Sequence, residues 1–313
     1  MRLALSAVIV LGLTAGATLW RAQAREAAAL QGQSREGAFV TVDGARVHYL
    51  QMGQGPDLVL IHGASGSLRE FTFQLMPELA KRYRVLAFDR PGLGLSDALP
   101  AANTSLAAQA GHLRAAAALL GVERPVVLGH SYGGSVALAW ALADPPAALV
   151  LVSAPSLPWP GTLDPWYRIN ETRAGRSVFV TLAAAWVPMS FVRTAIDGVF
   201  APEATPTGYA DHIGVGFTAR ASVVAINVAQ VNALRDEVVA MEPTYPTLDL
   251  PIETVHGDAD TIVPLTIHSG PLSQRLASAN LTVIEGAGHM PHQTRPGVVI
   301  AAIDRAAMRA GLR

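Results

Sequence analysis

The sequence contains no cysteine among its 313 residues. A cysteine nucleophile, a disulfide and a zinc–thiolate site are therefore all excluded, and the redox compartment stays open. Charge is also scarce, since 15% of the residues are charged and the formal net charge is -1. A chain without an excess of basic residues lacks the surface that a nucleic-acid backbone requires, so we expect no nucleic-acid partner.

Two kinds of motif are missing as well. No G-x-G-x-x-G follows the first expected strands, so no nucleotide cofactor is implied, and no spacing typical of metal ligands appears. We therefore expect neither a cofactor nor a metal. What the sequence does contain is apolar residues, which make up 50% of the chain. Its length suits one large domain with a sizeable insertion or tail.

The N-terminal segment is uncharged from residue 3 to residue 20, where Arg21 ends the run. Eighteen uncharged residues reach the lower limit for a helix that spans a bilayer, and Trp20 with Arg21 is typical of an interfacial anchor. We therefore predict a membrane anchor in residues 1–20, with the following domain outside the cytoplasm, in the periplasm or its equivalent. The alternative is a signal peptide with its cleavage site at Ala22-Gln23-Ala24, which would release the chain as a secreted protein.

The rest of the chain alternates between strand and helix patterns, with one interruption. Strands that are apolar throughout and bounded by helices indicate an α/β fold whose mostly parallel sheet is covered on both faces. We expect strands at 39–42, 47–51, 58–61, 84–88, 125–128, 148–152, 252–256 and 281–285, and helices at 68–83, 106–120, 133–143, 178–186, 223–234, 266–276 and 297–309. The predicted organisation is a stalk at 21–36, a core at 37–153 and 246–313, and an inserted helical cap at 154–245.

One motif indicates a candidate catalytic residue by itself. Gly129-His130-Ser131-Tyr132-Gly133 stands between an expected strand and an expected helix, where a nucleophile elbow places its serine. The turn is sharp, so small residues are needed two positions before and after the serine. This context makes Ser131 the candidate nucleophile.

The chain resembles the α/β-hydrolase superfamily over residues 37–313, in the branch with a helical cap. Besides the elbow, the resemblance rests on HGASGS at 62–67, DRPGLGLSD at 89–97, GDAD at 257–260 and GAGH at 286–289, in the family's order. It implies an α/β-hydrolase fold. The segment at 89–97 offers no nucleophile and is interpreted as scaffold.

The resemblance also implies the partners of Ser131. Asp260 is the expected acid and His289 the expected base, which together with Ser131 form a catalytic triad. Asp258 is the alternative acid and His292 the alternative base. If they do not have these roles, we expect Asp258 to hydrogen-bond its own turn and His292 to be an exposed or locally bonded loop histidine. With an ordinary histidine pKa, the rate should rise roughly through pH 6 to 7.

The resemblance implies an oxyanion hole formed by two backbone N–H groups, those of Tyr132 and Ala64. Ser65 is an alternative to Ala64. His62 is expected to brace that loop, and His130 to pack beside the nucleophile. The remaining histidines have no motif context and are interpreted as surface or satisfied core residues: His48, His112, His212, His256 and His268.

Serine at the elbow argues against the family's haloalkane dehalogenases and epoxide hydrolases, which use aspartate there. The expected function is a carboxylic ester hydrolase acting on a small acyl substrate through an acyl-enzyme. A carbon–carbon bond hydrolase, a perhydrolase and a non-catalytic binding member remain alternatives. The cap's aromatic residues favour an apolar substrate, although each of them could instead pack the cap onto the core: Trp159, Trp166, Tyr167, Trp186, Phe191, Phe200, Tyr209 and Phe217.

Overall fold

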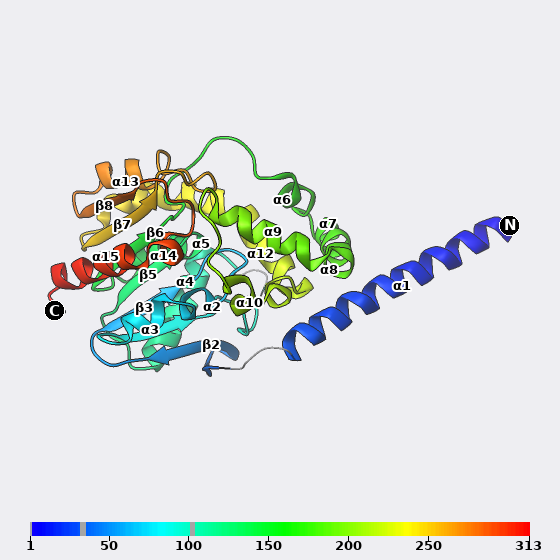
Figure 1. Cartoon of the computed structure of the whole chain (residues 1–313), viewed down its shortest axis with the longest axis horizontal. Coiled ribbons are helices and arrows are strands. Elements are labelled where there is room, and N and C mark those ends of the chain that lie inside the picture. The colour runs from blue at the N-terminus through cyan, green and yellow to red at the C-terminus, as the bar shows by residue number, and fades with distance from the viewer. Residues whose placement is uncertain (1, 32–35, 101–103) are drawn as a thin grey trace.

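The computed structural model of the chain describes residues 2–31, 36–100 and 104–313, and of residues 2–5, 7 and 8 it describes the backbone alone. A single eight-stranded sheet forms its centre, in the order β1-β2-β4-β3-β5-β6-β7-β8 (Figure 1). The strands are β1 (Ala38–Val42), β2 (Ala45–Met52), β3 (Asp57–Ile61), β4 (Arg84–Phe88), β5 (Val126–His130), β6 (Ala148–Val152), β7 (Ile252–Gly257) and β8 (Ala279–Ile284). β2 is antiparallel to both of its neighbours and all other pairs are parallel, which confirms the expected α/β fold.

Alternate residues of the central strands point to opposite faces of the sheet, as the two-residue period of a strand requires. Ile61, Val127 and Leu149 pack with helices on one face. Their chain neighbours Leu60 and Leu128 pack on the other. The first face is covered by α4 (Leu106–Leu119) and α5 (Tyr132–Ala143), and the second by α3 (Leu75–Leu79) and α15 (Pro296–Arg309), while α13 (Ser269–Arg275) and α14 (Pro291–Thr294) flank β8.

The prediction of a single helix at 68–83 is wrong. The segment forms two short helices, α2 (Arg69–Thr72) and α3, separated by an irregular residue, Gln74, with φ -141°. Pro77 gives the physical reason, because a proline lacks the N–H of a helix interior and is tolerated only in a first turn. The chain therefore restarts its helix at Leu75, which places Pro77 in the first turn of α3.

The insertion between β6 and β7 is helical and lies beyond one end of the sheet (Figure 1). It contains α6 (Pro165–Ile169), α7 (Arg173–Gly175), the π-helical turn η2 (Arg176–Val180), α8 (Thr181–Trp186), α9 (Met189–Phe200), α10 (Tyr209–Ile213), α11 (Val215–Thr218), α12 (Ala221–Met241) and the 3₁₀ turn η3 (Glu242–Thr247). We call this insertion the cap. α12 is the long cap helix that also contacts α5 of the core.

The N-terminal residues form one continuous helix, α1 (Arg2–Gln31), which packs against α8 and α11 of the cap. Thr18 and Ala22 are buried in this contact. Arg21 donates to the backbone oxygen of Ala185, and Arg25 donates to that of Ala184. These carbonyls belong to the last turn of α8, where a helix leaves its acceptors unpaired, so the two arginines cap α8.

Among the described residues, no single helix combines the length and the hydropathy needed to cross a membrane. Two consecutive helical segments, Arg173–Trp186 and Met189–Phe200, are together long and apolar enough to cross a membrane. They are bent by 105° relative to each other.

Candidate active site

Ser131 lies at the turn between β5 and α5 with φ 49° and ψ -125°, a conformation that L residues rarely adopt. The two flanking glycines make this turn possible. A Cβ on Gly129 would stand 2.2 Å from the backbone oxygen of Gly133, and a Cβ on Gly133 would stand 2.2 Å from that of Ile61. The strain that results is typical of a nucleophile elbow.

Three loops at the carboxyl ends of the parallel strands bring the predicted triad residues together. The hydroxyl of Ser131 lies 2.9 Å from Nε2 of His289, and Nδ1 of His289 lies 2.8 Å from Oδ2 of Asp260. Ser131 follows β5, Asp260 follows β7 and His289 follows β8. The side chains of Asp260 and His289 are buried, and Ser131 is 9% exposed at the floor of a cavity.

The acid and its histidine have shifted pKa values. Burial alone raises the pKa of Asp260, but hydrogen bonds from His256 and His289 outweigh burial and hold that pKa well below its usual value. Two backbone N–H groups, of Ile262 and Val263, also donate to Asp260. Burial is the main cause that lowers the pKa of His289, opposed by Asp260. At neutral pH His289 is therefore uncharged and faces an ionised Asp260.

The alternative acid and the alternative base both lie elsewhere than expected. Asp258 does not bond its own turn, because its Oδ1 accepts from the N–H of Gly286 in the loop before His289. His292 is fully buried, which corrects the expectation of an exposed or locally bonded loop histidine. Its Nε2 lies 3.2 Å from Oε1 of Glu70, a residue more than two hundred positions away in the sequence.

The loop after β3 carries Ala64 beside the elbow, so Ala64 and Tyr132 come from neighbouring segments. A Cβ on Gly63 would stand 3.2 Å from Cβ of Ser131, which shows how closely this loop approaches the nucleophile. The N–H of Ser65, the alternative donor, is already engaged by Oδ1 of Asn227 on α12 at 2.7 Å. This bond leaves Ala64 as the better placed of the two candidates.

A buried arginine holds the same loop. Arg90 donates to the backbone oxygens of His62 and Gly63 and to the side-chain oxygens of Gln109 and Gln230. Its guanidinium also stacks at 4.2 Å over the ring of Tyr132, and burial lowers the pKa of Arg90 to about 10. Nε2 of His62 accepts from the backbone N–H of Arg90, so His62 belongs to the bracing and not to the cavity.

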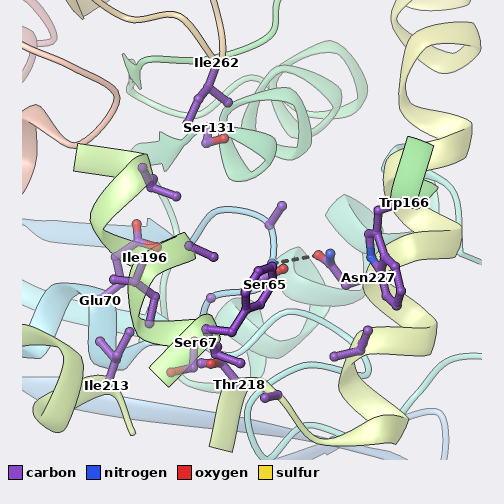
Figure 2. Close-up of a pocket in the computed structure, with 18 of the residues that line it drawn as sticks. Ser65, Ser67, Glu70, Ser131, Trp166, Ile196, Ile213, Thr218, Asn227 and Ile262 are labelled. Atoms are coloured by element: carbon purple, nitrogen blue, oxygen red, sulfur yellow. Dashed lines mark hydrogen bonds between the residues drawn. The ribbon is translucent and has the colours of Figure 1, made fainter. Parts of the chain in front are cut away.

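A cavity of about 560 Å³ extends from Ser131 and His289 into the cap. Figure 2 shows Ser131 beside Ile262, with Ile196 and Ile213 further along the wall. Of the eight cap aromatics proposed as lining, five line this cavity, namely Trp166, Tyr167, Phe191, Phe200 and Tyr209. Trp159, Trp186 and Phe217 are not among its lining residues. Trp159 packs against His268 of the core, whereas Trp186 is half exposed and contacts Thr18 and Arg21 of α1.

Three buried groups could be considered as metal ligands. Ligand atoms of Glu70, His130 and His292 lie within 4.8 Å of one another. However, Oε1 of Glu70 is only 2.7 Å from Nδ1 of His130, whereas two ligands of one tetrahedral zinc stand roughly 3.3 Å apart. The distance fits a shared proton better than a shared metal ion.

Three residues near the site have contacts that the sequence did not predict: Glu70, Arg90 and His256. Glu70 carries no motif signal of its own, and Arg90 lies in the segment at 89–97 that was interpreted only as scaffold. His256 is a buried histidine with partners on both ring nitrogens, as expected of a satisfied core residue, and its Nε2 also lies 3.2 Å from Oδ2 of Asp260. Its position four residues before Asp260, at the end of a buried strand, is the signal that could have placed it near the acid.

The fold and the site define a hydrolase of the α/β type, and comparison with known proteins agrees. The model of the alpha/beta hydrolase family matches residues 58–303, and the chain belongs to this family. Pimeloyl-[acyl-carrier protein] methyl ester esterase of Aeromonas hydrophila is 32% identical over 269 residues, which cover 81% of this chain and 96% of that relative.

Two other similarities differ in the activity of the relative. 2-Hydroxymuconate semialdehyde hydrolase of a Pseudomonas species is 28% identical over 259 residues, covering 81% of this chain and 87% of the relative. The crystal structure of a membrane phospholipase A, described as a bacterial virulence factor, superposes with a TM-score of 0.66 at 23% identity. That superposition covers 100% of this chain and 99% of the other. Family and relatives together support hydrolase activity on a small molecule.

Proposed function

We propose that the chain is a carboxylic ester hydrolase with a preference for apolar substrates. The observation that carries the proposal is the hydrogen-bonded series from Ser131 through His289 to Asp260 at the floor of an apolar cavity. A serine hydroxyl at its free pKa is a weak nucleophile, and a neutral histidine within 2.9 Å supplies the base that it needs.

The reaction divides into two acyl transfers. Ser131 Oγ bonds to the ester carbonyl carbon while its proton passes to Nε2 of His289, and Asp260 stabilises the imidazolium. The oxyanion is held by the N–H groups of Ala64 and Tyr132. The C–O bond to the alcohol then breaks as His289 returns the proton to the departing oxygen.

Water completes the cycle. His289 removes a proton from a water molecule, whose oxygen attacks the acyl-enzyme, and Ser131 recovers its proton as the acid is released. Hydrolysis of a carbon–carbon bond by the same triad is the second candidate, because the resemblance to the family includes such hydrolases; one relative that matches 81% of the chain is a 2-hydroxymuconate semialdehyde hydrolase.

A fluorophosphonate probe and an ester panel test the proposal. We expect the probe to label wild-type protein and not Ser131→Ala, and we expect Ser131→Ala to lose ester turnover while its circular dichroism is unchanged. p-Nitrophenyl esters of increasing chain length should be hydrolysed faster than a ring-fission product. Turnover that persists in Ser131→Ala overturns the mechanism, and preference for the ring-fission product favours the second candidate.

For localisation, we propose that α1 anchors the chain in a membrane with the hydrolase domain outside the cytoplasm. Large apolar side chains of α1 are exposed to more than half of their area, including Leu11, Leu13 and Trp20. Exposure of such side chains to water is unfavourable, at roughly 25 cal/mol per Å² of apolar surface. The whole-length match to a membrane phospholipase A is consistent with this proposal.

Fractionation of the tagged full chain tests the anchor. Retention of the protein in the membrane pellet after a carbonate wash is the expected result. Release into the soluble fraction, with an N-terminus beginning after Ala24, favours signal cleavage instead.

A further inference from the structure

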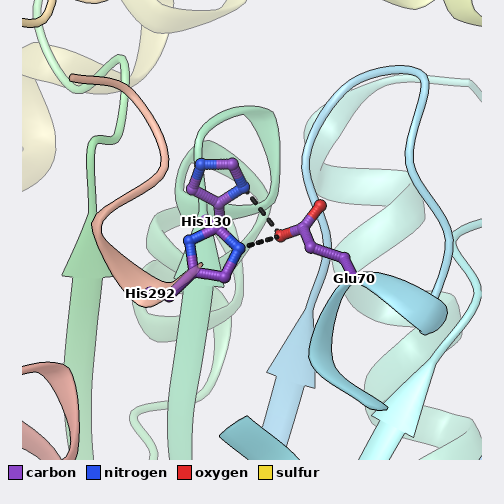
Figure 3. Close-up of side chains that lie close together, drawn as sticks. All are labelled: Glu70, His130 and His292. Atoms are coloured by element: carbon purple, nitrogen blue, oxygen red, sulfur yellow. Dashed lines mark ion pairs between the residues drawn. The ribbon is translucent and has the colours of Figure 1, made fainter. Parts of the chain in front are cut away.

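A second polar cluster lies beside the nucleophile, where two of its members, Glu70 and His130, also line the cavity, and the triad mechanism does not use it. It consists of Glu70 on α2, His130 at the end of β5 and His292 on α14, and each is at most 5% exposed in its side chain (Figure 3). Oε1 of Glu70 lies 2.7 Å from Nδ1 of His130 and 3.2 Å from Nε2 of His292. Buried ionisable groups are costly unless they are paired, so this cluster requires an explanation.

The positions of the neighbouring oxygens determine how many protons the cluster holds. Nε2 of His130 lies 3.1 Å from the backbone oxygen of His289, and a carbonyl oxygen can only accept, so Nε2 carries a proton. On the other side of the ring, Nδ1 and Oε1 of Glu70 lie 2.7 Å apart as an ion pair, and neither atom has a well-aligned hydrogen-bond partner among the described residues. Two unprotonated acceptors would repel each other at this distance, so the pair holds a second proton. Two protons are therefore shared by His130 and Glu70.

The surroundings of Glu70 favour its ionised form. Its Oε2 accepts from the backbone N–H of Gly63 at 3.3 Å, while its other oxygen faces the two histidines. Arg90, which holds the backbone of Gly63, interacts favourably with the same carboxylate. A carboxylate that faces several donors is stabilised as the anion, so the second proton belongs to His130.

The pKa shifts of the two groups agree with this assignment. Burial opposes ionisation of both, but Glu70 outweighs burial and raises the pKa of His130, while His130 outweighs burial and holds the pKa of Glu70 well below its usual value. His292 stays neutral, because burial lowers its pKa to about 4.

The resulting imidazolium lies next to the proposed base. The rings of His130 and His289 are 5.2 Å apart between centroids, and His130 also bonds the backbone of His289. The other titratable groups that interact with His289 in the described part of the chain are His256 at the end of β7, Asp260 just after β7, and His292, which is neutral. His130 therefore brings the positive charge that lies next to His289.

We propose that Glu70 and His130 form a buried carboxylate–imidazolium pair that positions the loop carrying His289 and keeps this base deprotonated at lower pH. Both are positioning residues, since neither touches the reacting atoms. The pair joins the loop after β3, the elbow and the histidine loop. The inference rests on the proposed role of His289, and it adds a control of its protonation to that role.

The pH dependence of kcat/KM for a p-nitrophenyl ester tests the pair. In Glu70→Gln the carboxylate is lost and His130 becomes neutral, so both charges of the pair disappear. The positive charge on His130 lies nearer to His289 than the negative charge on Glu70 and outweighs it, so we expect the acid midpoint of the profile to move up by several tenths of a pH unit. His292→Gln is the matched control, since it disturbs the same carboxylate without removing a charge, and its midpoint should stay where the wild type has it.

Nitrogen NMR of the histidines gives an answer that does not depend on activity or on folding of a variant. In wild-type protein at pH 7, His130 should show two protonated ring nitrogens, and His292 one. A neutral His130, or an unchanged midpoint in folded Glu70→Gln, overturns the inference. Absence of any wild-type turnover overturns the proposed function instead, and the nitrogen spectrum then still decides the state of the pair.

Discussion

The guanidinium of Arg25 on α1 donates a 2.9 Å hydrogen bond to the backbone oxygen of Val187, immediately after α8. The same nitrogen donates to Ala184, and both Ala184 and Val187 line the cavity above Ser131. The N-terminal helix therefore holds one wall of the cavity from outside.

Arg25→Ala should loosen that wall. With two hydrogen bonds lost, we expect the free energy of unfolding to fall by about 1–2 kcal/mol. We also expect kcat/KM to fall several-fold for p-nitrophenyl decanoate and little for p-nitrophenyl acetate, which needs less of the cavity. Urea unfolding and steady-state kinetics measure the two effects. The exposed Arg124 provides the control, as Arg124→Ala should change neither quantity; equal losses for both esters would contradict the role of the wall.

Asp260→Asn should separate the two acid candidates. An amide at this position cannot stabilise the imidazolium of His289 and favours the wrong tautomer, so we expect kcat to fall by roughly 10³–10⁴. Asp258→Asn changes a residue that bonds the N–H of Gly286 and should retain most of the activity. Burst-phase and steady-state assays on the two variants give the comparison, and a larger loss in Asp258→Asn would reverse the assignment.

The acid limb of wild-type kcat/KM should lie lower than the sequence alone suggested. Burial lowers the pKa of His289 below 6.5, and the rate rises as His289 loses its proton. We therefore expect half-maximal kcat/KM below pH 6.5, measured with circular dichroism at each pH to show that the protein is folded. A midpoint at or above pH 6.5 would contradict the assigned environment of His289.

Stability should decrease as the pH falls from about 6.5 towards about 4. Burial lowers the pKa of three histidines, His62, His268 and His292, to about 4 each. Between these pH values the unfolded chain binds more protons than the folded one, so acid favours unfolding, by up to roughly 3 kcal/mol for each histidine.

Urea unfolding at pH 7, 6 and 5 measures this dependence. His292→Gln should have a shallower slope than wild type, because one of the three groups no longer titrates. An equal free energy of unfolding for wild type at pH 7 and pH 5 would show that these histidines are not held in their neutral form.

Local patterns explain why much of the fold and site could be predicted. The elbow around Ser131 is five consecutive residues between a strand and a helix, and the turns with Asp260 and His289 follow two neighbouring strands of the parallel part of the sheet, β7 and β8. The resemblance to the family identified Asp260 and His289, and the carboxyl ends of parallel strands meet at one edge of a sheet, which explains why the three residues lie together.

Other features depend on contacts that no local pattern contains. Glu70 meets His130 sixty positions later, and Arg25 meets α8 across more than one hundred and fifty positions. The period of apolar residues also hid the break before α3, because Leu75 and Leu79 continue the spacing expected of one helix. Domain boundaries and the catalytic roles of the site residues remain predictions.

Two side chains of α12 have a consequence for protein engineering. Asn227 bonds the N–H of Ser65, and Gln230 bonds both Arg90 and the backbone oxygen of Pro91. The cap thus bonds the loop after β3 directly through Asn227, and indirectly through Gln230, which holds the Arg90 that bonds this loop. A chimera with the cap of another hydrolase would have a substrate cavity with different walls. It would also need an amide side chain at positions 227 and 230 to keep the loop after β3 in place.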